Sequence, residues 1–430
     1  MKFNKWKILG IAGALVLGYA VSSQAAEIKV DEDTFADFGL GIQAMYKYLD
    51  ERGVQPTAYN ANWFGVTLTR VYFDGQINKY VQFYADIDAI HHPSFNGTEW
   101  RTVSSDFDLR EGGVNLAFIP EFQIRIGELR IPFTRYQMVD EFARLMPTGA
   151  LQDPQIDPIT GIGGVLDGQL TLTTYYEPLR LIDPERDGIT GGIEVHGDLL
   201  DGMFRYTAGI FNEDNVVAGD DRYNSLAYAV RVEFTPTMMG FSPESTNTPS
   251  GKIADTYLGK KDVFTIGAGY YYERIEDDNL LANEDLRIKG YTIDAMFEKK
   301  YGTVVPNVQV GYVYLDDSHV YQSGSTWKVG DTYMWYIQGQ LLSDTVVGIG
   351  KPAIAARYEY KEIDGTFGGQ RDLSAYTYSV ALNYYIKGKA AQVSAGLDYT
   401  RYDDAAEAAL DQNNYDESLT DLYLFVQTKF

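Results

Sequence analysis

The sequence predicts an all-β fold, a transmembrane antiparallel β-barrel of about 16 strands with a long loop folded into its lumen. Three observations predict it: a secretory leader, period-two alternation of apolar and polar residues, and a last strand ending on Phe430. Leu422 and Leu424 share one face of that last strand, and Asp421 and Tyr423 share the other. One apolar face toward lipid and one polar face toward a lumen is typical of barrel strands.

The first residues predict a signal peptide over 1–25. A lysine-bearing start precedes the apolar run 8–21, and a small-x-small motif favours cleavage after Ala25, or less well after Ala26. The apolar run is shorter than the roughly 20 residues that a retained membrane helix needs. Residues 26–430 are therefore expected to form one barrel domain in the bacterial outer membrane.

The bulk composition narrows the possible partners. Asp and Glu number 60 against 36 Lys and Arg, which gives a formal net charge of -24, and Cys is absent. Nucleic acid is excluded as a partner because phosphate binding needs basic patches. Thiolate metal sites are excluded as well. The 34 tyrosines suit the two interfaces of a bilayer, so outer-membrane lipids are expected to surround the chain.

Segments in which every second residue is apolar recur along the chain, each about as long as a tilted membrane strand. The clearest are 80–89, 226–234, 354–361 and 374–387. A soluble β-sandwich, with its apolar face inside, is the alternative for any one of them. The leader and the terminal strand favour the barrel for the whole set.

The lengths of the connections predict the orientation of the strands. Tight turns are expected near Asn78, Pro120, Asp201, Gly302, 343–350 and Gly388. Longer loops are expected at 49–60, 90–105, 213–223, 275–287, 317–330, 363–372 and 403–419. Short turns of outer-membrane barrels face the periplasm. Counting backward from the last strand then makes 236–261 an unusually long periplasmic turn.

Strand directions alternate only if 132–188 is a single long excursion, with the apolar stretch 167–176 a part of it and not a wall strand. An 18-stranded barrel would need a second strand within 132–166, where four prolines make one hard to place. A long loop leaving a barrel strand is most easily accommodated by folding into the lumen. We therefore expect 132–188 to constrict the barrel; the alternative is a loop that stands above the membrane.

Residues 126–133, Ile-Gly-Glu-Leu-Arg-Ile-Pro-Phe, resemble the Gly-x-x-x-x-Pro-Phe run that opens the inward-folding loop of the phosphate-selective porin O/P family. The run 186–189, Arg-Asp-Gly-Ile, is similar to that family's return into the barrel. The resemblance covers mainly 120–215. It implies a 16-stranded, usually trimeric diffusion channel, and so a homotrimer. Phosphate selectivity in the family rests on dense ladders of basic residues; because none is found here, it is not carried over.

Charged residues of both signs gather at the start of the predicted constriction. They are Arg125, Arg130, Arg135, Asp140, Glu141 and Arg144. Opposed charges across a narrow lumen would select ions, whereas charges paired with one another would pin the loop to the wall; the two hypotheses are compatible. Strand parity also places charges on the lumen side, at Asp86, Asp88, Arg231, Glu233, Arg357 and Glu359.

The leading hypothesis for function is a passive channel for small hydrophilic solutes or ions, weakly cation-preferring because acidic clusters crowd the predicted loops. An anion- or phosphate-selective porin is one alternative, and a structural or adhesive surface barrel without an open pore is another. We find no catalytic motif, no metal-ligand spacing and no cofactor signature. The terminal Phe430 is expected to be the assembly signal read by the barrel-insertion machinery.

Overall fold

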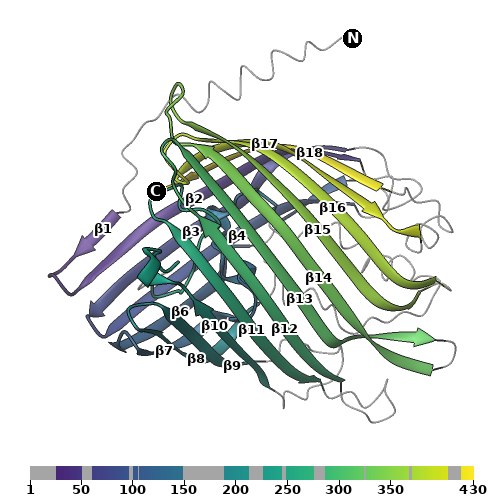
Figure 1. Ribbon diagram of the computed structural model, residues 1–430. Helices are drawn as coiled ribbons and strands as arrows, with labels where there is room; N and C mark the ends of the chain where they lie inside the picture. The colour runs from purple at the N-terminus through teal and green to yellow at the C-terminus, as the bar shows by residue number, and fades with distance from the viewer. Residues whose placement is uncertain are drawn as a thin grey trace.

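The wall of the molecule is a closed antiparallel barrel (Figure 1). The computed structural model describes residues 26–50, 61–95, 100–104, 106–148, 188–212, 226–244, 248–275, 286–323, 326–367, 370–404 and 418–430. The predicted signal peptide 1–25 and residues 149–187 of the predicted constriction loop lie outside the described residues.

Sixteen strands form the wall. In order they are β2 (Phe35–Asp50), β3 (Ala61–Asn78), β4 (Val81–Phe95), β6 (Asp108–Ile119), β7 (Phe122–Arg130), β8 (Ile189–Leu199), β9 (Phe204–Asn212), β10 (Leu226–Phe234), β11 (Val263–Ile275), β12 (Leu286–Glu298), β13 (Val304–Ser323), β14 (Thr326–Ser343), β15 (Lys351–Phe367), β16 (Gln370–Tyr385), β17 (Ala391–Tyr402) and β18 (Ser418–Lys429). The other two of the eighteen described strands, β1 (Ala26–Lys29) and β5 (Trp100–Ser104), extend β2 and β4 as hairpins.

The ring closes between its first and last wall strands. β18 pairs with β2 from Lys429 opposite Gly41 to Thr420 opposite Asp50. The expected count of about 16 strands is therefore confirmed. The described part of the run 132–166, residues 132–148, holds no further strand.

The two rims of the barrel differ. We call the rim where β2 begins and β18 ends the C-terminal rim, and the opposite one the loop rim. The turns expected near Asn78, Pro120, Asp201, Gly302 and Gly388 all lie at the C-terminal rim. At the loop rim, three expected loops are shorter than predicted because their flanks continue as β-hairpins, in 90–105, 317–330 and 363–372.

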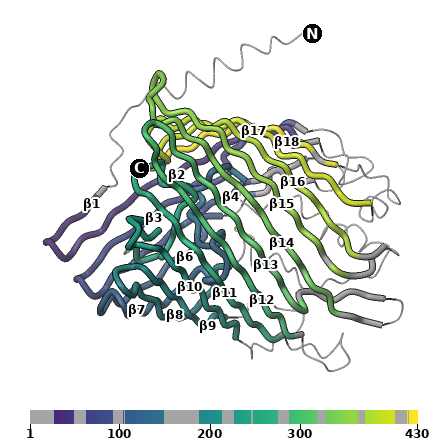
Figure 2. Tube along the Cα trace, viewed as in Figure 1, coloured from purple at the N-terminus to yellow at the C-terminus, as the bar shows by residue number. Residues whose placement is uncertain are grey.

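The wall is not equally tall all round. β7 to β10 have 9 to 11 residues, whereas β13 to β16 have 16 to 20. Figure 2 shows the long β13 and β14 on one side of the barrel and the much shorter β7 and β8 on another. Because a strand rises about 3.4 Å per residue, the longer strands make the wall taller on the side of β13 to β16 than on the side of β7 to β10.

Apolar side chains point outward, which is the reverse of a soluble β-sandwich. In β16, Tyr378, Val380 and Leu382 are 48%, 47% and 62% exposed, while Ser379 and Ala381 between them are buried. A surface of this kind is stable only against an apolar medium. Among the described residues no helix is long and apolar enough to span a bilayer.

Aromatic rings form a row across the outer surface of neighbouring strands. Tyr270 lies 5.4 Å from Tyr291, Tyr291 lies 6.1 Å from Tyr314, and Tyr314 lies 4.9 Å from Tyr333, measured between ring centroids. These four residues are direct cross-strand partners. Such pairs stabilise adjacent strands, and tyrosine combines an apolar ring with a hydroxyl that prefers the water side of an interface.

Two irregular segments run inside the barrel. The first, 132–148, follows β7 and contains the 3-10 helices η1 (Tyr136–Met138) and η2 (Glu141–Ala143). The second consists of the described residues 235–244 and 248–262 of the stretch 235–262, which joins β10 to β11, and it contains η4 (Thr237–Met239). The stretch 236–261 was expected to be an unusually long turn, and it does join β10 to β11 at the C-terminal rim. It is more than a turn, because its buried Glu244, Asp255 and Thr256 find their partners on the inner wall and on the first segment.

A charge placed on the outward face of β16 is expected to destabilise the barrel in lipid. Val380→Lys should lower the free energy of unfolding by about 2–4 kcal/mol if Val380 lies at mid-membrane depth. Val346→Lys, at an exposed turn of the C-terminal rim, should leave it nearly unchanged. Urea titration in lipid vesicles measures both. An equal, small effect of the two substitutions would contradict an apolar surrounding for this face.

Candidate functional site: the inner layer

The two inner segments are joined to each other by backbone hydrogen bonds. Ile253 N donates to Met138 O at 2.8 Å, and Asp140 N donates to Ile253 O at 3.1 Å. Asp255 N donates to Ala143 O at 3.0 Å. Val139 and Ile253 thereby form a parallel bridge. We call the two joined segments, 132–148 and 235–262, the inner layer.

The local fold of the first segment is set by its own polar side chains. Asp140 caps η2, its carboxylate accepting from Phe142 N at 3.0 Å. Gln137 accepts from Thr134 N at 2.9 Å, which closes the turn before η1. The Arg130 guanidinium donates to Gln137 O at 2.8 Å and to Val139 O at 3.2 Å. These bonds satisfy backbone groups that a buried irregular segment would otherwise leave unpaired.

Wall strands on several sides hold the first segment. Phe133 O accepts from Arg231 of β10 at 3.1 Å, and Leu145 O accepts from Asn383 of β16 at 2.8 Å. Phe142 O accepts from Gln427 of β18 at 2.9 Å. In the turn 386–390, Lys389 donates to the carbonyl of Ala143 at 2.7 Å, and burial lowers the pKa of that ammonium to about 8.

An ion-paired cluster lies where the inner layer meets β3, β4, β6 and β7. We call it the Arg70 cluster; its members are Arg70, Asp86, Asp88, Glu111, Arg130, Asp140, Glu141 and Lys252. Arg70 lies 2.7 Å from Asp88 and 2.8 Å from Glu141. Arg130 lies 2.8 Å from Glu111 and 3.0 Å from Glu141. Every charge here is opposed by another, which is what allows the group to be buried.

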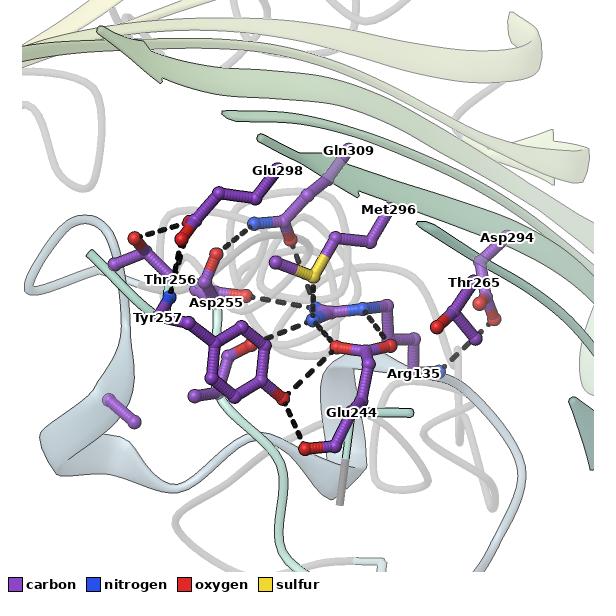
Figure 3. A network of polar contacts seen from close by, with 12 residues as sticks. Arg135, Glu244, Asp255, Thr256, Tyr257, Thr265, Asp294, Met296, Glu298 and Gln309 are labelled. Carbon is purple, nitrogen blue, oxygen red and sulfur yellow. Dashed lines mark hydrogen bonds and ion pairs between the residues drawn. The ribbon is translucent and has the colours of Figure 1, made fainter. Parts of the chain in front are cut away.

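A second cluster surrounds Arg135 on the other side of the inner layer (Figure 3). Its guanidinium lies 2.5 Å from Glu244 and 3.1 Å from Asp255, and donates to Gln309 at 3.0 Å. Figure 3 shows Glu244 and Asp255 from the second inner segment closing on Arg135, with Gln309 and Met296 reaching in from the wall. Arg135 is 1% exposed, and its ion pairs and hydrogen bonds hold the first segment against the second segment and the wall.

The remaining predicted residues are also paired. Arg125, in β7, contacts Glu194 of β8 and donates to Pro249 O at 2.5 Å. Arg144 lies 3.8 Å from Glu141. On the wall, Arg231 lies 2.7 Å from Asp294 and 3.0 Å from Glu233, and Arg357 lies 3.2 Å from Glu359. The predicted charges are thus divided among several places. Arg130, Asp140 and Glu141 join the first segment to the wall in the Arg70 cluster, and Arg135 joins it to the second segment. Arg144 pairs within the first segment, and Arg125 binds the second segment instead.

Several residues of the site were not predicted from the sequence. Arg70 lies on the same face of β3 as buried Leu68, so the parity of that strand was a usable signal. Glu111 likewise follows the parity of β6. Lys252 and Asp255 had no such signal, because 235–262 has no periodic pattern and its partners lie far away in the sequence.

Two other places in the described residues bring polar groups together. A cavity of about 40 Å³ between the inner layer and the wall is bounded by Arg125, His196, Arg205 and Arg231; it has room for a few water molecules only. Asp316, Asp317 and Asp331 bring carboxylate oxygens within 4.8 Å of one another. Lys289 at 3.0 Å and Tyr314 at 2.9 Å already bind two of these carboxylates, so we assign no metal to them.

Comparisons with known proteins define the class of the fold. No family model matches the chain. Solved structures with the same architecture include OmpF of Salmonella typhi in complex with daunomycin (TM-score 0.55, 12% identity, 94% of this chain and 100% of that one) and OprB of Pseudomonas putida (TM-score 0.53, 10% identity, 92% and 94%). OmpT of Vibrio cholerae, an outer membrane protein solved in a trimer form, has a TM-score of 0.50 at 12% identity over 93% of this chain and 100% of that one.

The fold is thus that of porin-like, sixteen-stranded outer-membrane barrels. One curated relative, an uncharacterized protein of Aquifex aeolicus (strain VF5), is 24% identical over 284 residues, or 63% of this chain. The match spans 58% of that relative's length. The specific resemblance to the phosphate-selective porin O/P family gains no support from these comparisons.

Removing the guanidinium of Arg135 is expected to destabilise the protein strongly. Arg135→Met would leave Glu244 and Asp255 buried without their cation, at a cost of about 3–5 kcal/mol in the free energy of unfolding. The control is Lys300→Met, which breaks an exposed pair with Asp344 and should cost less than about 1 kcal/mol. Denaturant unfolding in detergent measures both. A cost for Arg135→Met no larger than the control would mean that this pairing contributes little.

Proposed function

We propose that the chain is an outer-membrane porin, a passive diffusion channel for small hydrophilic solutes or ions. The observation that carries the proposal is the closed sixteen-strand wall, apolar outside, with many polar and charged residues among those facing inward, around an inner layer bound to that wall by charged side chains. Solutes would pass beside this layer by diffusion, and 132–188 would set the size limit. No catalytic step enters the proposal.

The proposed location and assembly follow from the same fold. A porin-like barrel with a cleavable leader belongs in the bacterial outer membrane, among its lipids, with Phe430 as the signal for the insertion machinery. In the barrel, Phe430 N and O both bond to Leu40 at 3.0 Å, so the last residue is part of the closing seam. A homotrimer is proposed from the resemblance to the phosphate-selective porin O/P family, and the trimer form of OmpT supports it.

We propose a weak preference for cations. Arg130 and Arg135, which could have made a basic constriction, are neutralised by Glu111, Glu141 and Glu244. The long-range field of a chain with formal net charge -24 then decides, and it attracts cations at low salt. An anion- or phosphate-selective porin is the alternative, in which guanidinium groups of the inner layer would face the solute.

A surface barrel without an open pore is the candidate from another class. One observation favours it: inward-facing side chains such as Gln309, Glu359 and Ser394 have essentially no exposed surface. In an open water-filled pore, such groups would be hydrated. Current through single molecules separates the two candidates directly.

The test is reconstitution in a planar bilayer with potassium chloride on both sides. We expect stepwise current, and in a salt gradient a reversal potential of the sign that marks cation preference, fading as ionic strength rises and the Debye length falls below about 10 Å. Absence of current from folded protein would favour the surface barrel. Anion preference that is lost on substituting Arg125, Arg130, Arg135 and Arg144 by Ala would favour the anion-selective alternative.

A further inference from the structure

The second inner segment, 235–262, crosses the whole lumen although both its ends lie at the C-terminal rim. On one side Lys252 contacts Asp86 of β4 and lies 2.7 Å from Glu111 of β6. On the other side Asp255 O accepts from Asn307 and Gln309 of β13, at 2.8 and 2.6 Å. β4 and β13 are eight places apart in the ring of sixteen, so the segment spans the barrel along a diameter.

Segments from opposite rims therefore meet inside the barrel. The first leaves β7 at the loop rim, and the second leaves β10 at the C-terminal rim. The Val139–Ile253 bridge and the Arg135–Glu244 ion pair join them into one layer. Anything that passes along the lumen must go round both segments, so the loop-rim segment alone does not define the narrowest place.

Lys252 has a special position in this layer. It is the only lysine or arginine that the described part of 235–262 places between two wall carboxylates, those of Asp86 and Glu111. Its side chain is 13% exposed, whereas Glu111 is 0% exposed. Lys252 thus both tethers the segment to the wall and cancels negative charge in the interior.

Resting on the proposed channel function, we propose that 235–262 is the second half of the constriction, and that Lys252 is its tether and a determinant of ion selectivity. Without the ammonium group, Asp86 keeps its contact with Arg70 and Glu111 its contact with Arg130, and the layer carries one more negative charge. Inorganic cations are then favoured over anions. The segment, released on one side, leaves a wider passage.

The first experiment compares Lys252→Gln with Lys300→Gln in planar bilayers. One unit charge about 7 Å from the ion at the dielectric constant of water changes its local concentration about threefold. Loss of that charge raises the local potassium concentration and lowers the local chloride concentration, each by this factor. We therefore expect Lys252→Gln to raise the potassium-to-chloride permeability ratio about ninefold and to increase the conductance. Lys300→Gln changes an exposed residue of the C-terminal rim and should leave the permeability ratio and the conductance at the parental values. Identical behaviour of the two variants would overturn the proposal.

A rescue experiment separates the charge from any folding defect. Lys252→Cys offers a unique thiol, because the chain has no cysteine. The denatured variant is alkylated either with an aminoethyl reagent, which restores an ammonium group at nearly lysine length, or with a neutral reagent of similar size, and is then refolded. We expect parental selectivity only from the aminoethyl product. Equal selectivity of the two products would remove Lys252 as a determinant.

The joint between the segments is tested without any current. In the variant carrying Val139→Cys and Ile253→Cys, oxidation should form an internal disulfide, detected by peptide mapping, because the two positions are bridge partners. Failure to cross-link in folded barrels would overturn the layer. If the parent protein carries no current while the cross-link forms, the proposed channel function fails and the layer stands. If the parent conducts but the cross-link and the Lys252 effects are absent, the reverse holds.

Discussion

The structure depends on one constraint: the hydrogen-bond ladder has no free edge. The pairing of β18 with β2 turns a long meander into a ring, in which the polar backbone groups of each wall strand face a neighbour. Only such a ring presents an apolar outer surface without exposing unpaired amides to an apolar medium. That closure also shapes the interior. Every second side chain of each wall strand points into the lumen, where it must pack against other groups, be hydrated or be paired.

The interior meets this demand with compensated charge. Arg70 and Arg135 are each 1% exposed, yet each is surrounded by two or more carboxylates. Burying such groups costs solvation that only close partners offset, so the pairs specify where the two inner segments sit more than they add stability. The same arrangement removes the strong local field that isolated arginines would create, and with it the clearest route to anion selectivity.

Much of the wall could be predicted from the sequence, because its pattern is local. Alternation in 374–387 and a terminal Phe430 are readable one strand at a time, and the alternation of strand directions gave the count of sixteen. The inner layer could not be predicted in this way. Val139 and Ile253 carry no periodic signal, and their contact depends on a closed ring that brings the ends of β7 and β10 to the same interior.

The path of 235–262 has a consequence for the order of folding. Its contacts join partners that are far apart in the chain. Lys252 and Asp86 are separated by 166 residues, and two strands, β11 and β12, lie between Asp255 and Asn307 in the sequence. Segments that close such distances form late, because the entropy of bringing their ends together is lost before the contact repays it. The wall of the barrel would thus close before 235–262 takes its place inside. The segment would then enter the lumen from the C-terminal rim as the last step of folding.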